Sequence, residues 1–224
     1  MQIKKILSLF SLFISCSLIS KSYQQEIDDE IDDEIDDEID DVDNGSRQQC
    51  VSDIIFGSQL LKNDCCDNTY FKCQDKTLTE IVLPNNNLSG KLSETIGNVS
   101  TLELLNLSVN QLTGNLPESI CELPNLKTLY LYDNDIGGSI PDSINQLTQL
   151  EKLYLYNNNL NGELPDSLGD MQNLTHLLLG NNKITGRIPS SIGSLQSIEV
   201  MSFLKNSLTG EIPETIGNLK TLGN

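Results

Sequence analysis

The chain is 224 residues long and carries 14 Lys and Arg against 32 Asp and Glu, which gives a net charge of −18. No part of it is strongly basic, so the sequence excludes a protein that binds nucleic acid through the phosphate backbone. It has a single histidine and shows no nucleophile with a partnered base and no metal-ligand pattern, so we predict a non-enzyme that needs no cofactor or metal.

Residues 1–22 have the organisation of a secretory signal peptide. Two lysines precede an uncharged apolar run over 6–19, and the small residues Ser20 and Ser22 stand where a cleavage site requires them. The alternative is an uncleaved membrane anchor, but the run has 14 residues, whereas a membrane span needs about 20. We therefore predict a secreted, extracellular protein, or a cell-surface one if the chain is a fragment.

Residues 23–46 form a strongly acidic tract with four consecutive copies of Glu-Ile-Asp-Asp. The segment 26–43 alone holds 13 of the 32 acidic residues. Like charges four residues apart oppose a helix, and little apolar surface can be buried, so we expect a disordered, solvated spacer. The alternative is a weak binder of cations or basic surfaces. The tract lacks the glycine and terminal glutamate of an EF-hand loop, so no defined calcium site is predicted.

Internal repetition dominates the rest of the sequence. Residues 78–221 are six copies of a 24-residue unit, followed by the start of a truncated seventh over 222–224. Positions 1, 4, 6, 11, 15, 19 and 22 are apolar in every unit, position 13 is always Gly, and position 16 is Pro in five units. The units span 78–101, 102–125, 126–149, 150–173, 174–197 and 198–221.

The spacing within the unit predicts a solenoid. Apolar residues at positions 4 and 6 alternate with polar or variable ones, which is typical of a short strand. The Gly at position 13 and the Pro at position 16 oppose a continuous helix, so the chain turns back within each unit. One unit cannot cover its own apolar residues, so we expect the units to stack with their strands in a parallel sheet.

An asparagine recurs at position 9 of every unit. Its amide group has donors and an acceptor, so we expect it to satisfy backbone groups where the chain leaves the strand, and not to bind a ligand. The members of this asparagine ladder are Asn86, Asn110, Asn134, Asn158, Asn182 and Asn206.

Two strings, LYLYNNNLNGELPDSLGDM over 153–171 and LLLGNNKITGRIPSSIGSL over 177–195, resemble the plant-type extracellular leucine-rich repeat family. The resemblance implies a leucine-rich repeat solenoid of the α/β class, mostly β, with a ligand-binding concave parallel sheet and short 3-10 segments on the convex side. Receptor-kinase ectodomains, receptor-like proteins and polygalacturonase inhibitors belong to this family, and the fold alone does not choose among them.

Four cysteines within 47–77 predict a cap on the first unit. The first coil of a solenoid exposes an apolar edge that needs a cover, and the apolar residues of 54–61 fit a short amphipathic helix there. Export favours disulfides over a zinc site, and the sequence alone permits three pairings. The pairs that the family resemblance implies are Cys50 with Cys65 and Cys66 with Cys73.

The chain departs from the family pattern at two places. The Trp usual in the cap is absent, and we expect Tyr70 or Phe71 to substitute for it. Cys121 replaces the Gly usual at position 20 and has no evident partner, so we expect a buried free thiol, with intermolecular pairing as the alternative.

Five Asn-X-Ser/Thr sequons would accept glycans in a eukaryotic secretory pathway. The sequon at position 5 of the second unit is expected on the concave sheet, where a glycan would block binding, and it therefore favours a binding site in later units. The acceptors are Asn44, Asn87, Asn98, Asn106 and Asn173.

Positions 3, 5, 7 and 8 are expected to project from the concave face. Units three and four place four tyrosines there on neighbouring strands, about 4.8 Å apart, which predicts one aromatic patch. Such a patch with a polar rim favours recognition of protein or sugar; the alternative is that each ring only packs against its cross-strand neighbour. The predicted contacts are Tyr130, Tyr132, Tyr154 and Tyr156, flanked by Asp133, Lys152, Asn157 and His176.

These features predict an exported, non-catalytic module that recognises a protein or a polysaccharide through its concave face. Inhibition of a cell-wall-degrading enzyme is a narrower version of this function. The alternatives are a fragment of a membrane receptor or adhesion ectodomain, for which these residues provide no span beyond the signal, and an architectural component of a wall or matrix.

Overall fold

The computed structural model describes residues 71–75 and 77–223. All of these residues belong to one compact unit. The predicted signal peptide, the acidic tract and most of the predicted cap lie outside the described residues, as do Asn44, Cys50, Cys65, Cys66 and Tyr70.

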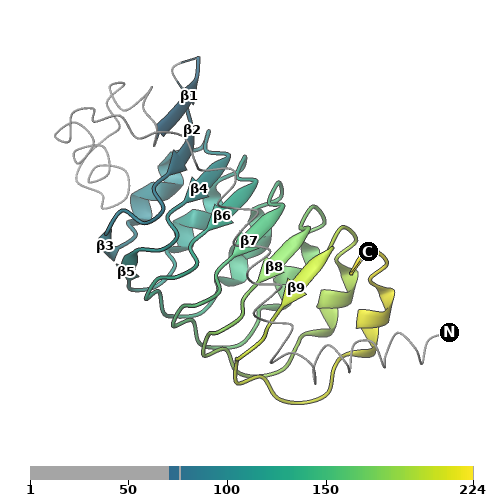
Figure 1. Ribbon diagram of the computed structural model, residues 1–224. Helices are drawn as coiled ribbons and strands as arrows, with labels where there is room; N and C mark the ends of the chain where they lie inside the picture. The colour runs from purple at the N-terminus through teal and green to yellow at the C-terminus, as the bar shows by residue number, and fades with distance from the viewer. Residues whose placement is uncertain (1–70, 76, 224) are drawn as a thin grey trace. The chain divides into compact units, whose positions relative to one another are not determined.

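Short strands alternate with short 3-10 helices along the described residues, as Figure 1 shows. The strands are β1 (Phe71–Gln74), β2 (Thr77–Val82), β3 (Ser89–Lys91), β4 (Leu104–Asn106), β5 (Gln111–Thr113), β6 (Thr128–Tyr130), β7 (Lys152–Tyr154), β8 (His176–Leu178) and β9 (Val200–Ser202). The 3-10 helices are η2 (Glu94–Asn98), η3 (Glu118–Glu122), η4 (Asp142–Gln146), η5 (Asp166–Asp170), η6 (Ser190–Ser194) and η7 (Glu214–Asn218).

The described strands form a seven-stranded sheet in the order β1-β2-β4-β6-β7-β8-β9, and β3 pairs with β5 in a second, two-stranded sheet. From β2 to β9 neighbouring strands of the large sheet are parallel, and paired residues are 24 positions apart, as Leu105 is from Leu129. The period of the sequence is therefore the step from one strand to the next, which confirms the predicted solenoid with a parallel sheet.

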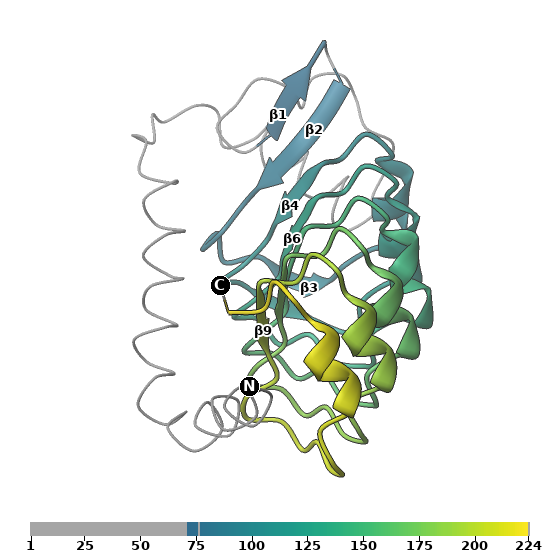
Figure 2. The same ribbon diagram turned by 90° about the vertical axis from the view of Figure 1, so that its right-hand side faces the viewer.

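Each coil carries its strand on one side and its 3-10 helix on the other, as the view along the stack in Figure 2 shows. A proline directly precedes each helix from η3 to η7; before η5, for example, Pro165 has φ −68°. The fixed φ of proline suits the residue that leads into a helix. The first coil has Ser93 instead, and its Oγ accepts a hydrogen bond from the Thr95 N–H at 3.2 Å, as an N-cap residue does.

The repeated apolar residues fill the interior of the coils. Leu129, Leu153 and Leu177, at position 4 of successive units, are fully buried. At the amino-terminal edge, β1 pairs antiparallel with β2 and places the fully buried Phe71 opposite Ile81. The replacement of the missing Trp by Tyr70 or Phe71 stays a prediction.

Cys73, on β1, takes part in a disulfide bond. Its partner lies outside the described residues, so the pairing with Cys66 stays a prediction.

Candidate functional site

The asparagine ladder directs its side chains into the stack. In the fourth unit, Asn158 Nδ2 donates to the Leu131 carbonyl of the preceding coil at 2.9 Å, and Asn158 Oδ1 accepts from the Ile136 N–H at 3.0 Å. The first coil has no preceding unit, and Asn86 Nδ2 donates within its own coil instead. These bonds to the backbone are what a structural role requires. The residues that repeat the Asn158 pattern are Asn110, Asn134, Asn182 and Asn206.

The four predicted tyrosines, which we call the tyrosine patch, lie together on β6, β7 and the residues that follow them. Tyr130 and Tyr154 are paired in the sheet register, and their rings stack with centroids 4.5 Å apart and an interplanar angle of 22°. Two residues on, Tyr132 and Tyr156 stack at 4.6 Å and 9°. The contacts between the two pairs are tilted, at 6.2 and 6.4 Å. The structure therefore brings all four rings into one cluster.

The tyrosine patch is more enclosed than the exposed cluster that the sequence suggested. Tyr132, Tyr154 and Tyr156 retain 6%, 4% and 3% of their surface, while Tyr130 is half-buried. Stacking explains part of this enclosure because each ring hides the facing side of its partner. A ligand that uses these rings must replace contacts that the chain itself makes to them.

Two flanking residues extend the patch toward β8. Lys152 and His176 are neighbours in the register of β7 and β8 and are both half-buried. The His176 ring lies 6.1 Å from that of Tyr154, and its Nδ1 lies 2.8 Å from Thr175 Oγ1. The structure thus places a cationic side chain and an imidazole beside the aromatic rings.

Asp133 and Asn157, the other two predicted contacts, bind each other. Asn157 Nδ2 donates to Asp133 Oδ1, and Asn181 Nδ2 donates to Asn157 Oδ1, each at 2.6 Å. We call these three residues the rim ladder. All three have positive φ, of 53° to 54°, and stand at position 8, directly before the asparagine ladder. The sequence analysis missed this ladder, although two of its members were in the predicted site.

The described sequons differ in accessibility. Asn106 is only 3% exposed, and its Oδ1 accepts a hydrogen bond from Ser108 Oγ at 2.7 Å. Asn173 Nδ2, the atom that would carry the glycan, donates to the Thr148 carbonyl at 2.8 Å. The expectation of an accessible acceptor on the concave sheet is therefore wrong for Asn106. The exposed acceptors among the described residues are Asn87, Asn98 and Asn173.

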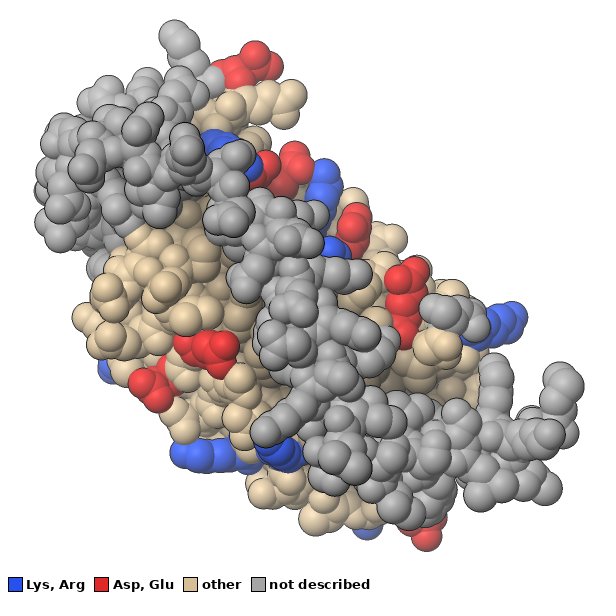
Figure 3. All heavy atoms as spheres, viewed as in Figure 1, with Lys and Arg blue, Asp and Glu red and all other residues tan. Residues whose placement is uncertain are grey.

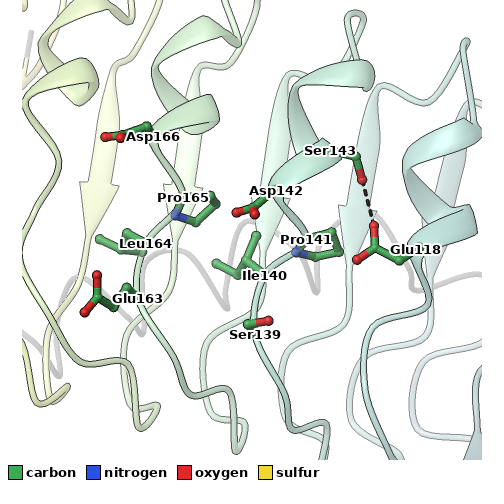
Figure 4. A pocket seen from close by; sticks show the side chains of 10 residues that line it. All are labelled: Glu118, Ser139, Ile140, Pro141, Asp142, Ser143, Glu163, Leu164, Pro165 and Asp166. Atoms are coloured by element: carbon green, nitrogen blue, oxygen red, sulfur yellow. Dashed lines mark hydrogen bonds between the residues drawn. The ribbon is translucent and has the colours of Figure 1, made fainter.

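A hollow of about 550 Å³ lies beside η4 and η5, away from the strands of the large sheet. Its lining includes Glu118, which accepts a hydrogen bond from Ser143 Oγ at 2.8 Å, as Figure 4 shows. Other acidic side chains, such as Asp142 and Asp166, line it as well. Among residues 71–75 and 77–223, no group of three or more His, Cys, Asp or Glu is placed to hold a metal ion.

Cys121 is a free, buried thiol, which confirms that prediction. It stands in η3, where a glycine at the same position of other units lets the next coil approach closely: a Cβ on Gly97 would lie 2.5 Å from the Ser119 carbonyl oxygen. Burial raises the pKa of the Cys121 thiol, and a hydrogen bond with Ser143 partly opposes that rise. The protonated thiol is thus the favoured form within the stack.

Charged side chains are interspersed over the described surface. On the face shown in Figure 3, the coloured acidic and basic side chains do not gather into a large area of one sign. Ion pairs at the described surface include Lys127 with Glu103 at 2.6 Å and Lys72 with Glu80 at 3.3 Å. The bond with Glu103 raises the pKa of Lys127. Such exposed pairs contribute little to stability.

Comparison with family profiles gives three matches, all to leucine-rich repeats: residues 76–136 match "Leucine rich repeat", 124–169 match "Leucine Rich repeats (2 copies)" and 173–195 match "Leucine Rich Repeat". The chain belongs to the plant-type extracellular leucine-rich repeat family. No curated protein matches the chain.

Solved structures of plant proteins resemble the described fold. The plant peptide hormone receptor RGFR1 in complex with RGF2 is 38% identical, with a TM-score of 0.64, and the match covers 65% of this chain and 23% of that one. The SOBIR1 receptor-kinase ectodomain from Arabidopsis thaliana is 29% identical, with a TM-score of 0.64, and the match covers 79% and 99%. The BIR3–SERK2 complex from the same plant is 31% identical, with a TM-score of 0.61, and the match covers 77% and 90%.

The chain spans only 17% to 28% of the length of the first four receptor ectodomains that it matches. Among these, the peptide hormone receptor RGFR1 was solved with RGF2, and HAESA was solved with the peptide hormone IDA. In the part of this leucine-rich repeat chain that the structure describes, no helix has the length and apolar character to cross a membrane.

Proposed function

We propose that this leucine-rich repeat chain is an exported, non-catalytic module that recognises a segment of another protein through its concave face. The observation that carries the proposal is the tyrosine patch. Tyrosine provides a large, rigid contact area together with a hydroxyl group, and clusters of this kind dominate binding energy in protein interfaces. Lys152 and His176 add polar groups beside the rings.

The relatives favour a protein partner over a polysaccharide. RGFR1 was solved with RGF2, and HAESA with IDA and the co-receptor SERK1. Inhibition of a cell-wall-degrading enzyme would be one use of such a surface, because it also requires recognition of a protein.

Selection from a displayed library of random dodecapeptides on the purified, oxidised chain tests the proposal. We expect wild-type protein to enrich a related set of sequences, and synthetic copies of them to bind with a measurable Kd. Tyr130, the most accessible ring, should be a main contact, so that Tyr130→Ala weakens binding by at least about tenfold. The matched control is Asp135→Ala, at position 10 and so outside the predicted concave positions.

Because three of the rings are buried, a loss of binding must be separated from a loss of fold. A variant with all four tyrosines replaced by Phe retains the stacked rings and removes only the hydroxyl groups, and circular dichroism checks that it stays folded. Enriched peptides that bind Tyr130→Ala and the four-Phe variant as tightly as wild type would refute the tyrosine patch as the site. Tyr130-dependent retention of a cell-wall polysaccharide, without any enriched peptide, would replace the protein partner by a sugar.

The ectodomain of a membrane receptor is a second candidate, and one comparison favours it. The match to the SOBIR1 receptor-kinase ectodomain covers 99% of that chain, so a repeat array of this size serves in a receptor. Sequencing of the complete transcript tests this candidate. A hydrophobic span followed by a kinase after residue 224 would support the receptor, and a stop codon there would support the secreted module.

A further inference from the structure

The solenoid imposes the same unusual backbone conformation at position 8 of every coil. The φ angles there are 49° at Asn85, 54° at Val109, 54° at Asp133, 53° at Asn157, 53° at Asn181 and 53° at Lys205. Asn and Asp tolerate this left-handed region because their short polar side chains make local hydrogen bonds, whereas a β-branched side chain is strained in it. Val109 is the only β-branched residue with positive φ among the described residues.

Val109 is also exposed. It retains 42% of its surface, and Ile212 is the other large apolar side chain exposed among the described residues, at 40%. Ile212 occupies a core position of the last described coil, where no further described coil covers it. Val109 has described coils on both sides, so its exposure follows from its position on the rim and not from the end of the stack.

The position of Val109 connects it with the tyrosine patch. Its backbone N–H donates to the Tyr132 carbonyl at 3.0 Å, which places it one coil before the stacked rings. Asp133, the first member of the rim ladder, is the next residue at position 8, so Val109 takes the place where another polar member would continue that ladder. An exposed apolar side chain on a strained backbone does not stabilise the fold. Residues with strained backbone conformations cluster at functional sites, and Val109 lies beside a candidate site.

We propose that Val109 is a contact residue of the recognition site, where it binds an apolar side chain of the partner's segment. This inference rests on the proposed function and extends its footprint by one unit toward the amino terminus, beyond the units that the sequence analysis favoured. The partner segment thus runs across β4, β6 and β7, with an aliphatic or aromatic side chain over Val109 and further contacts on the tyrosine patch.

Two substitutions separate strain from recognition. Val109→Thr retains the branched shape and the strain but replaces a methyl group by a hydroxyl. Val109→Asn relieves the strain and can hydrogen-bond to Asp133. We expect Val109→Asn to raise Tm by about 2 to 4 °C, and Val109→Thr to leave Tm near that of wild type. Both should weaken binding of the synthetic peptides from the library selection by about fivefold or more, because both remove apolar contact.

The combination of higher stability with weaker binding in Val109→Asn is the result that a merely structural role does not give. Asn85→Val is the matched control: it introduces the same strain at position 8 of the first coil and should lower Tm without changing peptide affinity. Peptides that depend on Tyr130 but bind both Val109 variants as tightly as wild type would overturn this inference and leave the proposed function intact. An unchanged Tm in Val109→Asn would overturn its premise of strain, and a selection that enriches no peptide would overturn both proposals.

Discussion

Two ladders of hydrogen-bonded side chains run side by side through units three to five of this solenoid, one residue apart in each of these units. The asparagine ladder at position 9 points into the stack, and its three central members, Asn134, Asn158 and Asn182, are at most 9% exposed. The rim ladder at position 8 lies at the surface, where Asn181 is exposed and Asn157 is half-buried. Members of the asparagine ladder bond to backbone groups, whereas members of the rim ladder bond to one another.

The difference shows that period and residue type do not reveal the role of a side chain. Both ladders repeat every 24 residues, and Asn157 and Asn158 are identical and adjacent. What distinguishes them is the partner: a buried backbone N–H or carbonyl has no alternative to the amide, whereas a side chain on the rim can exchange its neighbour for water or a ligand. Disruption of the first ladder should therefore change stability strongly, and disruption of the second should change it less.

Asn158→Ala should produce the largest effect. It removes the acceptor of the buried Ile136 N–H and leaves that donor unsatisfied, whereas the Leu131 carbonyl loses one donor but keeps Asn134 Nδ2. An unsatisfied buried donor costs about 1 to 3 kcal/mol, and the lost bond to Leu131 adds to this, so we expect the free energy of unfolding, measured by urea titration, to fall by about 2 to 3 kcal/mol.

Asn86→Ala provides the control for this substitution within the same ladder. Asn86 is half-buried, and its Nδ2 donates to Pro84 in its own coil. We expect a loss of about 1 kcal/mol or less. Equal losses at the two positions would show that contacts between coils do not set the strength of the ladder.

Asn157→Ala should have a smaller effect, of about 1 to 2 kcal/mol, from two sources. It removes two side-chain hydrogen bonds, to Asp133 and from Asn181, and it places a Cβ-bearing residue without local hydrogen bonds at φ 53°. Asn157→Gly removes the same bonds but accepts that φ without strain. The difference between the free energies of unfolding of the two variants, measured by urea titration, therefore gives the cost of a positive φ at a residue that has a Cβ. A Gly variant that is less stable than the Ala variant would contradict the assignment of strain to position 8.

Positions 8 and 9 of the unit show which features of this protein could be predicted from the sequence and which could not. Strand positions, buried apolar residues and the asparagine ladder were predictable because the same residue, or another apolar one, occupies the same place in each coil. The rim ladder was not, because position 8 holds Val109 and Lys205 as well as Asn and Asp. Its common feature is the backbone conformation, which the geometry of the stack imposes and composition does not encode.

The tyrosine patch was also only partly predictable from the sequence. Strand register predicted that Tyr130 and Tyr154 would be neighbours, and the structure stacks their rings. The low accessibility of Tyr154 and Tyr156 was not predictable, because enclosure depends on every atom around a side chain and not on its position in the repeat.

A double-mutant cycle on Tyr132 and Tyr156 tests whether this stack contributes beyond the burial of its rings. The two rings are nearly parallel, at 9°, with centroids 4.6 Å apart. We expect a coupling energy of about 0.5 to 1.5 kcal/mol from the two single Leu variants and the double Leu variant, measured by urea titration. The corresponding cycle on Tyr130 and Tyr132, which are tilted at 6.2 Å, should give a smaller coupling. Equal couplings would mean that ring orientation is irrelevant to stability here.

The smallest effect should be a pH dependence from Cys121, which lies inside the stack like the asparagine ladder. Burial is the main reason that the pKa of its thiol is raised, so the folded chain holds this proton more tightly than the unfolded chain does. The resulting stability is present in full below the pKa of an unfolded cysteine, about 8.5. It is lost as the pH rises from there through the folded pKa, because the unfolded state then binds fewer protons than the folded state.

We therefore expect wild type to lose stability relative to Cys121→Ala as the pH increases from 8 to 10 in the presence of a reductant. Lys and Tyr side chains also titrate in this range, but they are common to both proteins and cancel in the difference. A thiol that the solvent reaches as freely in the folded as in the unfolded chain would give parallel pH profiles for the two proteins. That result would place Cys121 outside the enclosed part of the coil, in conflict with its burial in η3, where it contacts Ser143 of η4.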